Sequence, residues 1–274
     1  VMQSSEALER TAYELAWDNI NEGVYYIEPR FAPQLHMNDD VSFIDAVRSV
    51  DSGLRRARDE HNAKVQPGQL RFEYGIIVCA MRMFTKNFSS YYRKLFAVHP
   101  SAPPKHVYGM ASLELARAAV HAVREYGLPI VGFDLAGQEN GYPANDHVEA
   151  YQYAHANFLK KTVHAGEAYG PESIYQAITD LHAERIGHGY HLFSPWLIDD
   201  ENIDKRLYVE ELSQYIADRR ITIEVCITSN LQTNPNLKLL EHHTYRDMLK
   251  GRLAATFCTD NRTVSRTTVT GEVT

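Results

Sequence analysis

The chain has 274 residues, of which 44% are hydrophobic and 23% are charged, and its net charge is −7. This composition is ordinary for a globular protein, and the acidic balance argues against partners such as nucleic acid or an anionic membrane. No apolar run approaches the roughly 20 residues that span a bilayer, and no signal peptide is visible. Cys79, Cys226 and Cys258 lie in apolar runs without a disulfide pattern, so we expect a cytoplasmic protein.

The first half of the chain alternates predicted helices and strands. An amphipathic helix at 4–22, capped by Ser4 or Ser5, leads to a strand at 24–28 and a proline-flanked turn at 29–33. The elements expected after it are a helix at 41–54, a strand at 71–81, helices near 89–96 and at 110–126, a strand at 128–135 and a helix at 145–160.

The same alternation continues through the second half. The expected elements are strands at 162–165, 184–187, 221–227 and 254–259, separated by helices at 171–182, 201–219 and 237–250. Strands that alternate with helices predict a parallel sheet. Because polar residues gather at the carboxyl ends of these strands, we predict an α/β fold, a single TIM (β/α)₈ barrel domain over residues 1–274. The chain opens on a helix, so we expect strand 1 and the C-terminal helix or helices of the barrel to lie outside this segment.

Three predicted strands end in residues that can carry chemistry. The strand at 162–165 presents His164 and, three residues later, Glu167. The next strand ends in His188 between two glycines, and the last predicted strand leads to Asp260. An imidazole can bind zinc, and a nearby carboxyl can transfer protons to the group that the metal activates. In a barrel these ends meet at one mouth, so we interpret them as one site.

Other polar residues are expected at the same mouth, and several familiar signatures are absent. The additional mouth residues are Glu28, Arg30, Arg82, Asp134, Gly137, Thr228, Ser229, Asn230 and Asn261. The chain contains no His-Glu-x-x-His, Cys-x-x-Cys or Gly-x-Ser-x-Gly motif and no phosphate-binding glycine loop. Four further histidines, His36, His191, His242 and His243, are expected to be solvated in loops or on helix surfaces.

These motifs together resemble those of the adenosine deaminase family within the amidohydrolase barrels. The resemblance covers nearly the whole chain in order, and its motifs are His164-Ala165-Gly166-Glu167, Gly187-His188-Gly189, Thr228-Ser229-Asn230, Thr259-Asp260, Asp134-Leu135-Ala136-Gly137 and Glu28-Pro29-Arg30-Phe31-Ala32-Pro33. That family hydrolytically deaminates 6-aminopurine nucleosides with one zinc ion. The resemblance therefore implies an enzyme of purine metabolism that hydrolyses C–N bonds of cyclic amidines and binds one Zn²⁺ per chain.

The resemblance also implies roles for individual residues. His164 and Asp260 would be zinc ligands, and Asp260 would also belong to the catalytic group. Glu167 would carry a proton to purine N1. His188 would orient the attacking hydroxide and stabilise the alkoxide that develops at C6.

Substrate contacts are implied for three more residues. The Gly137 backbone would meet the base, and Asp134 and Asn261 would also belong to the substrate site.

Two features depart from the family pattern. No His-x-His occurs in this chain, although the family takes two more zinc ligands from such a pair on strand 1; we expect that pair upstream. Asn261 stands where the family usually has a second Asp, which leaves the exact substrate open.

We predict a zinc-dependent aminohydrolase that acts on adenosine. Adenine, or a 5′-modified adenosine such as aminodeoxyfutalosine, is an alternative substrate. A non-catalytic nucleoside-binding relative is a second alternative, but such a protein has no need for a proton carrier beside a metal ligand. A third is a barrel amidohydrolase acting on amides or phosphoesters, against which the Asp134–Gly137 motif argues. The sequence does not indicate the oligomeric state.

Overall fold

The structure, a computed structural model, describes residues 2–274. Its internal contacts divide the chain into two compact units. Unit 1 comprises Val1–Asp134 and Glu149–Lys160, and unit 2 comprises Leu135–Val148 and Lys161–Thr274. The chain first passes from unit 1 to unit 2 within strand β5, which spans Ile130–Ala136.

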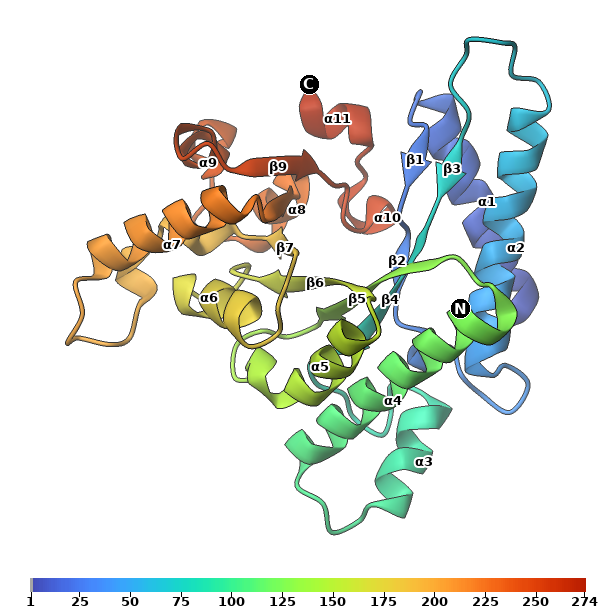
Figure 1. The fold of residues 1–274 in the computed structure, drawn as a ribbon, viewed down its shortest axis with the longest axis horizontal. Helices are drawn as coiled ribbons and strands as arrows, with labels where there is room; N and C mark the ends of the chain where they lie inside the picture. The colour runs from blue at the N-terminus through green and yellow to red at the C-terminus, as the bar shows by residue number, and fades with distance from the viewer. Residues whose placement is uncertain (1) are drawn as a thin grey trace. The chain divides into compact units, whose positions relative to one another are not determined.

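Two long helices, α1 (Ser5–Asn21) and α2 (Phe43–Asn62), pack against each other at the start of unit 1 (Figure 1). Ser4 caps α1 through its side chain, as predicted, and Ser42 forms a capping box with Asp45 at the start of α2. Helix α2 extends past its predicted end. The other helices of the unit are α3 (Ser90–Val98), α4 (Pro104–Tyr126) and α5 (Val148–Ala156), whose first residue belongs to unit 2.

The strands of unit 1 are β1 (Tyr26–Ile27), β2 (Arg30–Phe31), β3 (Glu73–Tyr74), β4 (Ile76–Met81) and β5. Strand β1 pairs in parallel with β3, β2 pairs in parallel with β4, and the second group continues in the order β2–β4–β5. The prediction of a turn at 29–33 was wrong in part, because Arg30 and Phe31 form a strand opposite Ile77 and Val78. Such a pairing depends on residues far along the chain, which a local pattern of prolines does not reveal.

Unit 2 holds four parallel strands in the order β6–β7–β8–β9. They are β6 (Lys160–Ala165), whose first residue belongs to unit 1, β7 (Arg185–His188), β8 (Thr222–Val225) and β9 (Ala254–Phe257). The helices between and after them are α6 (Pro171–Thr179), α7 (Lys205–Arg219), α8 (Ile227–Thr233), α9 (Tyr245–Lys250), α10 (Arg262–Ser265) and α11 (Val269–Val273). Within the unit, this confirms the predicted alternation of strands and helices.

The region after β8 differs from the prediction. The strand predicted at 221–227 ends at Val225, and residues 227–233 form α8. Helix α8 stops at Asn234, which precedes a proline and is extended. The predicted helix at 237–250 is present only as α9 and a short 3₁₀ turn at Leu240–His242. His243 is extended between these two segments and its side chain is buried, so burial of that ring overrides the local helical pattern.

All three cysteines are free thiols; Cys79 lies in β4, and Cys226 and Cys258 directly follow β8 and β9. Within residues 2–274, no helix has the length and apolar character needed to cross a membrane.

Candidate active site

His164 and His188 come from adjacent parallel strands of unit 2. The pairing of β6 with β7 sets His164 opposite Gly187 and Ala165 opposite His188. The two imidazole rings lie 5.3 Å apart between centroids, because Gly187 leaves room beside His164: a Cβ at Gly187 would lie 3.3 Å from the His164 ring. His188 is 2% exposed, whereas His164 is partly exposed.

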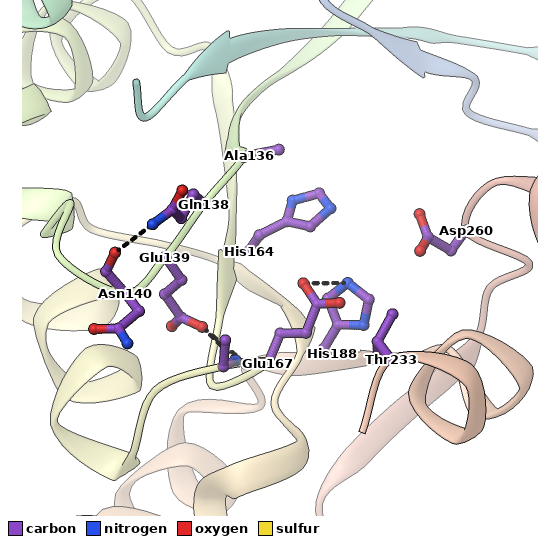
Figure 2. A pocket seen from close by; sticks show the side chains of 11 residues that line it. Ala136, Gln138, Glu139, Asn140, His164, Glu167, His188, Thr233 and Asp260 are labelled. Atoms are coloured by element: carbon purple, nitrogen blue, oxygen red, sulfur yellow. Dashed lines mark hydrogen bonds and ion pairs between the residues drawn. The ribbon is translucent and has the colours of Figure 1, made fainter. Parts of the chain in front are cut away.

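Glu167 reaches the same place from the loop that follows β6. Its Oε2 atom lies 3.5 Å from Nε2 of His188, and its side chain is 30% exposed (Figure 2). Gly166 turns this loop with a φ of 71°. His188 also has a positive φ, 64°, which is uncommon for a residue with a Cβ and is typical of strained functional positions.

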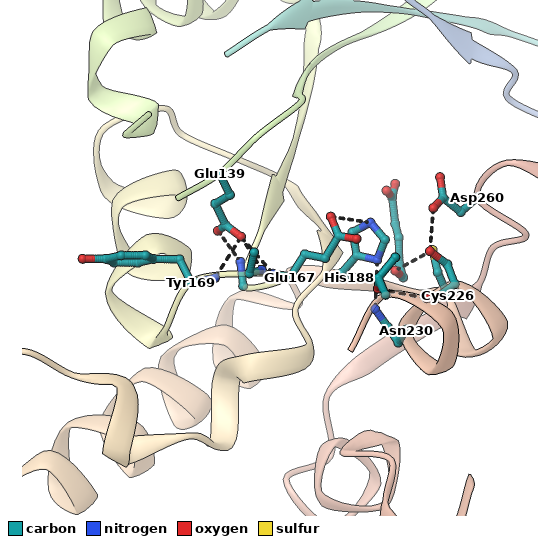
Figure 3. Close-up of polar contacts among 12 residues, drawn as sticks. Glu139, Glu167, Tyr169, His188, Cys226, Asn230 and Asp260 are labelled. Atoms are coloured by element: carbon teal, nitrogen blue, oxygen red, sulfur yellow. Dashed lines mark hydrogen bonds and ion pairs between the residues drawn. The ribbon is translucent and has the colours of Figure 1, made fainter. Parts of the chain in front are cut away.

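Asp260 follows β9 and, after His188, is the second non-glycine residue of the site with a left-handed backbone, at a φ of 51°. Its Oδ2 atom accepts a hydrogen bond of 2.8 Å from the Ser229 hydroxyl on α8 (Figure 3). Asp260 itself is exposed. The Ser229 hydroxyl therefore orients a carboxylate that is still open to a ligand.

These side chains line a cavity of about 410 Å³ in unit 2 (Figure 2). Its lining residues are Ala136, Gly137, Gln138, Glu139, Asn140, His164, Glu167, Ala168, His188, Thr233 and Asp260. The volume lies in the range of roughly 300–1,000 Å³ that is usual for small-molecule sites. The structure thus brings together five residues singled out from the sequence, namely Gly137, His164, Glu167, His188 and Asp260.

Two predicted substrate residues, Asp134 and Asn261, are not among the residues that line this cavity. Asp134 is fully buried in unit 1, where its carboxylate accepts a hydrogen bond of 3.1 Å from Arg30. Asn261 caps α10, because its Oδ1 atom accepts from the Val264 N–H at 3.1 Å. The cap uses only Oδ1, so the predicted contact between the Asn261 amide group and substrate stays a prediction.

Glu139 is a residue of the site that the sequence did not single out. Its buried carboxylate accepts hydrogen bonds from four consecutive backbone N–H groups, those of residues 166–169, at 2.7–3.1 Å. A fifth hydrogen bond comes from the Ser173 hydroxyl at 2.5 Å. Glu139 therefore holds the loop that carries Glu167. The only sequence signal was its place two residues after Gly137.

The prediction that four histidines are solvated was wrong for two of them. His243 is 4% exposed and His36 is 9% exposed, whereas His242 is exposed. Burial lowers the pKa of His243 to about 4, with a nearby Glu272 carboxylate opposing the shift, so the ring is neutral near pH 7. His191 is partly buried, and burial lowers its pKa as well.

The residues around the cavity offer donor types that suit zinc. His164 supplies an imidazole and Asp260 a carboxylate, both common zinc ligands. Among residues 2–274, however, no three His, Cys, Asp or Glu side chains are grouped as a metal site. Catalytic zinc sites usually have three protein ligands. The donor types of His164 and Asp260 suit two of these three ligand positions.

Comparison with known proteins decides the family. The family model for adenosine deaminase matches residues 1–274. The chain is 34% identical over 275 aligned residues to an adenosine deaminase from Mycobacterium tuberculosis, and the match covers 100% of this chain and 65% of that protein. The chain belongs to the adenosine deaminase family. It spans about two thirds of the length of the curated family members that it matches.

Solved structures agree on the fold of this family member. An amidohydrolase from Burkholderia ambifaria, solved with bound Zn, superposes with a TM-score of 0.73 at 20% identity, covering 98% of this chain and 62% of the other. The N6-methyl-AMP deaminase from Arabidopsis thaliana gives a TM-score of 0.68 at 22% identity, covering 99% and 67%. These similarities confirm the predicted fold class, a parallel α/β fold of the TIM-barrel type.

Proposed function

We propose that this protein removes the 6-amino group of a purine nucleoside by hydrolysis, with adenosine as its substrate. The observation that carries this proposal is the convergence of His164, Glu167, His188 and Asp260 on one cavity of about 410 Å³. A proton carrier, a second titratable ring and two metal-type donors in one small pocket match what the reaction needs. Membership of the adenosine deaminase family supports the same assignment.

In the proposed reaction, water adds to C6 of the purine, and the C6–N bond then breaks to release ammonia and leave inosine. Glu167 delivers a proton to N1, which makes C6 more electrophilic. His188 presents Nε2 to the same region, since this atom lies 3.5 Å from the Glu167 carboxylate. There it orients the attacking oxygen and stabilises the charge that develops on it.

We assign His164 and Asp260 as two ligands of a zinc ion. When bound, zinc supplies a water-derived nucleophile at neutral pH, because it lowers the pKa of water from 15.7 to about 7. The hydrogen bond from Ser229 orients the Asp260 carboxylate for this role. Gly137 lines the cavity without a side chain, so its backbone can approach the base.

Three alternatives remain. Two are other substrates, adenine and a 5′-modified adenosine, and the third is a protein that binds a nucleoside without turnover. Adenine and a 5′-modified adenosine keep the same reacting atoms, and a solved relative of similar fold is an N6-methyl-AMP deaminase. A nucleoside-binding relative without turnover is less consistent with the site, because Glu167 and His188 are held within 3.5 Å of each other beside the metal-type donors.

The test is a substrate panel on the purified, zinc-supplemented protein. Ammonia release is measured with adenosine, adenine, AMP and N6-methyl-AMP at equal concentrations. The proposal expects the highest kcat/KM with adenosine. Faster turnover of AMP or N6-methyl-AMP would move the assignment to a nucleotide, and binding of adenosine without ammonia release would support the non-catalytic alternative.

A further inference from the structure

A line of polar atoms runs from the buried ring of His243 to the catalytic ring of His188. Nε2 of His243 lies 3.2 Å from Oδ1 of Asn230, and Nδ2 of Asn230 lies 3.3 Å from Nδ1 of His188. All three side chains are 4% exposed or less. Figure 3 shows Asn230 and Glu167 on different sides of the His188 ring.

The direction of these hydrogen bonds is set by the backbone at the far end of the line. The Tyr245 N–H donates to Nδ1 of His243 at 3.0 Å. A backbone N–H can only donate, so Nδ1 of His243 must accept. Burial keeps this ring neutral by lowering its pKa to about 4. Its single proton therefore lies on Nε2 and is donated to the Asn230 carbonyl oxygen.

This donation fixes the orientation of the Asn230 amide. With Oδ1 engaged by His243, the Asn230 NH₂ group points to Nδ1 of His188 and donates to it. Nδ1 of His188 then has no proton, and the neutral ring carries its proton on Nε2. That is the atom 3.5 Å from the Glu167 carboxylate at the cavity.

Packing holds His243 in place for this role. The ring of Tyr190 packs edge-on against His243, with centroids 5.3 Å apart and an interplanar angle of 72°. The His243 side chain enters the core from the segment between the 3₁₀ turn at 240–242 and α9. Helix α8 carries both Asn230 and Ser229, so one helix orients two groups at the site, His188 and Asp260.

We propose that His243 and Asn230 are positioning residues that lock His188 in the tautomer with its proton on Nε2, facing the cavity. The effect of this lock on catalysis rests on the proposed function, whereas the tautomer itself does not. If the lock were released, the Asn230 amide could rotate and accept from Nδ1 of His188. Nε2 would then lose its proton, and His188 could no longer donate a hydrogen bond into the cavity from that atom.

The test is ¹⁵N NMR of the histidine side chains in the purified protein at mildly alkaline pH, where neutral tautomers are distinguished by their nitrogen shifts. The wild-type protein should show protonated Nε2 and unprotonated Nδ1 in His188. Asn230→Asp, which cannot donate from this carboxylate, should move the proton to Nδ1. His243→Leu should produce a mixture, and His243→Gln, whose amide can still donate to Asn230, should restore the wild-type pattern.

A matched control is His242→Leu, which changes an exposed neighbouring histidine and should leave the His188 signals unchanged. With adenosine as substrate, Asn230→Asp should lower kcat roughly 10²-fold while KM changes little, as expected for loss of a proton-positioning group. Wild-type His188 protonated on Nδ1 would overturn the inference, even if a variant fails to fold. So would an unchanged tautomer in folded Asn230→Asp. The predicted tautomer in a protein that deaminates none of the panel would refute only the proposed function.

Discussion

Glu139→Gln should lower both the free energy of unfolding and kcat, because Glu139 holds the loop that carries Glu167. Both carboxylate oxygens of Glu139 are engaged: Oε1 accepts from the Gly166 N–H and the Ser173 hydroxyl, and Oε2 accepts from the N–H groups of residues 167–169. A Gln side chain has only one acceptor oxygen. If that oxygen takes the Oε2 position, the NH₂ group takes the Oε1 position and faces the Gly166 N–H. Both groups are donors, so neither finds an acceptor there.

The magnitude follows from these contacts. An unpaired buried N–H costs about 1–3 kcal/mol, and hydrogen bonds to a charged acceptor are worth about 1.5–3 kcal/mol, more than those to a neutral one. Because Ser173 can reverse its hydroxyl and accept from the amide, we expect a net loss of about 2–4 kcal/mol in the free energy of unfolding. A displaced Glu167 should also lower kcat by roughly 10- to 100-fold, since a shift of 1 Å in a reacting group can cost that much.

Urea denaturation measures the first effect and steady-state kinetics the second. Hydrogen exchange gives a direct readout, because the amides of residues 166–169 should exchange faster in Glu139→Gln than in the wild type. Glu201→Gln is the matched control: its side chain is 83% exposed, and its pair with Lys205 should contribute little. An unfolding free energy within about 0.5 kcal/mol of the wild type, with unchanged exchange at these amides, would refute the reasoning.

Three further predictions concern the metal, pH and substrate contacts. His164→Ala and Asp260→Ala should each abolish stoichiometric zinc binding; normal zinc content in both, by elemental analysis, would contradict the ligand assignment. Burial lowers the pKa of His243 from 6.5 to about 4, so between these pH values only the unfolded chain takes up the proton. The free energy of unfolding should thus fall by on the order of 3 kcal/mol as pH drops through this window, and should be unaffected by this group above it. His243→Gln should flatten that part of the pH dependence; an unchanged slope in denaturation experiments would show that other groups cause it. If the Asn261 amide donates to purine N7, Asn261→Ala should weaken kcat/KM roughly 10- to 100-fold for adenosine and much less for 7-deazaadenosine. Equal losses for the two substrates would leave Asn261 only its role as the cap of α10.

The strand-end residues of the cavity could be predicted because their placement follows from a simple rule. His164 and His188 end neighbouring parallel strands, so the register of β6 and β7 brings them together. Asp260 follows β9 in the same unit, and Glu167 follows β6 by a short glycine turn. Each is a titratable residue at or shortly after the end of a β-branched or apolar run, which is a local pattern. The fold class could be predicted for the same reason, since it depends on the alternation of strands and helices.

The supporting residues could not be predicted in this way, because their partners are distant or are backbone atoms. Glu139 binds N–H groups 27 to 30 residues further along the chain, and no side-chain pattern marks such acceptors. His243 was expected on the surface, since a neighbouring pair of histidines in a polar stretch gives no sign of burial. Its role depends on Tyr190 and Asn230, which only the folded chain brings to it. Strand β2 was missed for a similar reason, because its partner, β4, lies far along the sequence.

The proton carrier is the most direct point at which to test the proposed chemistry. Glu167→Gln keeps the size of the side chain but removes its ability to release a proton, and it should be compared with the wild type in adenosine binding and in kcat. The proposed function predicts unchanged zinc content and nucleoside affinity, with kcat lowered roughly 10²-fold or more. A Glu167→Gln enzyme that turns over adenosine within a few-fold of the wild type would contradict it, since another group would then be moving the proton.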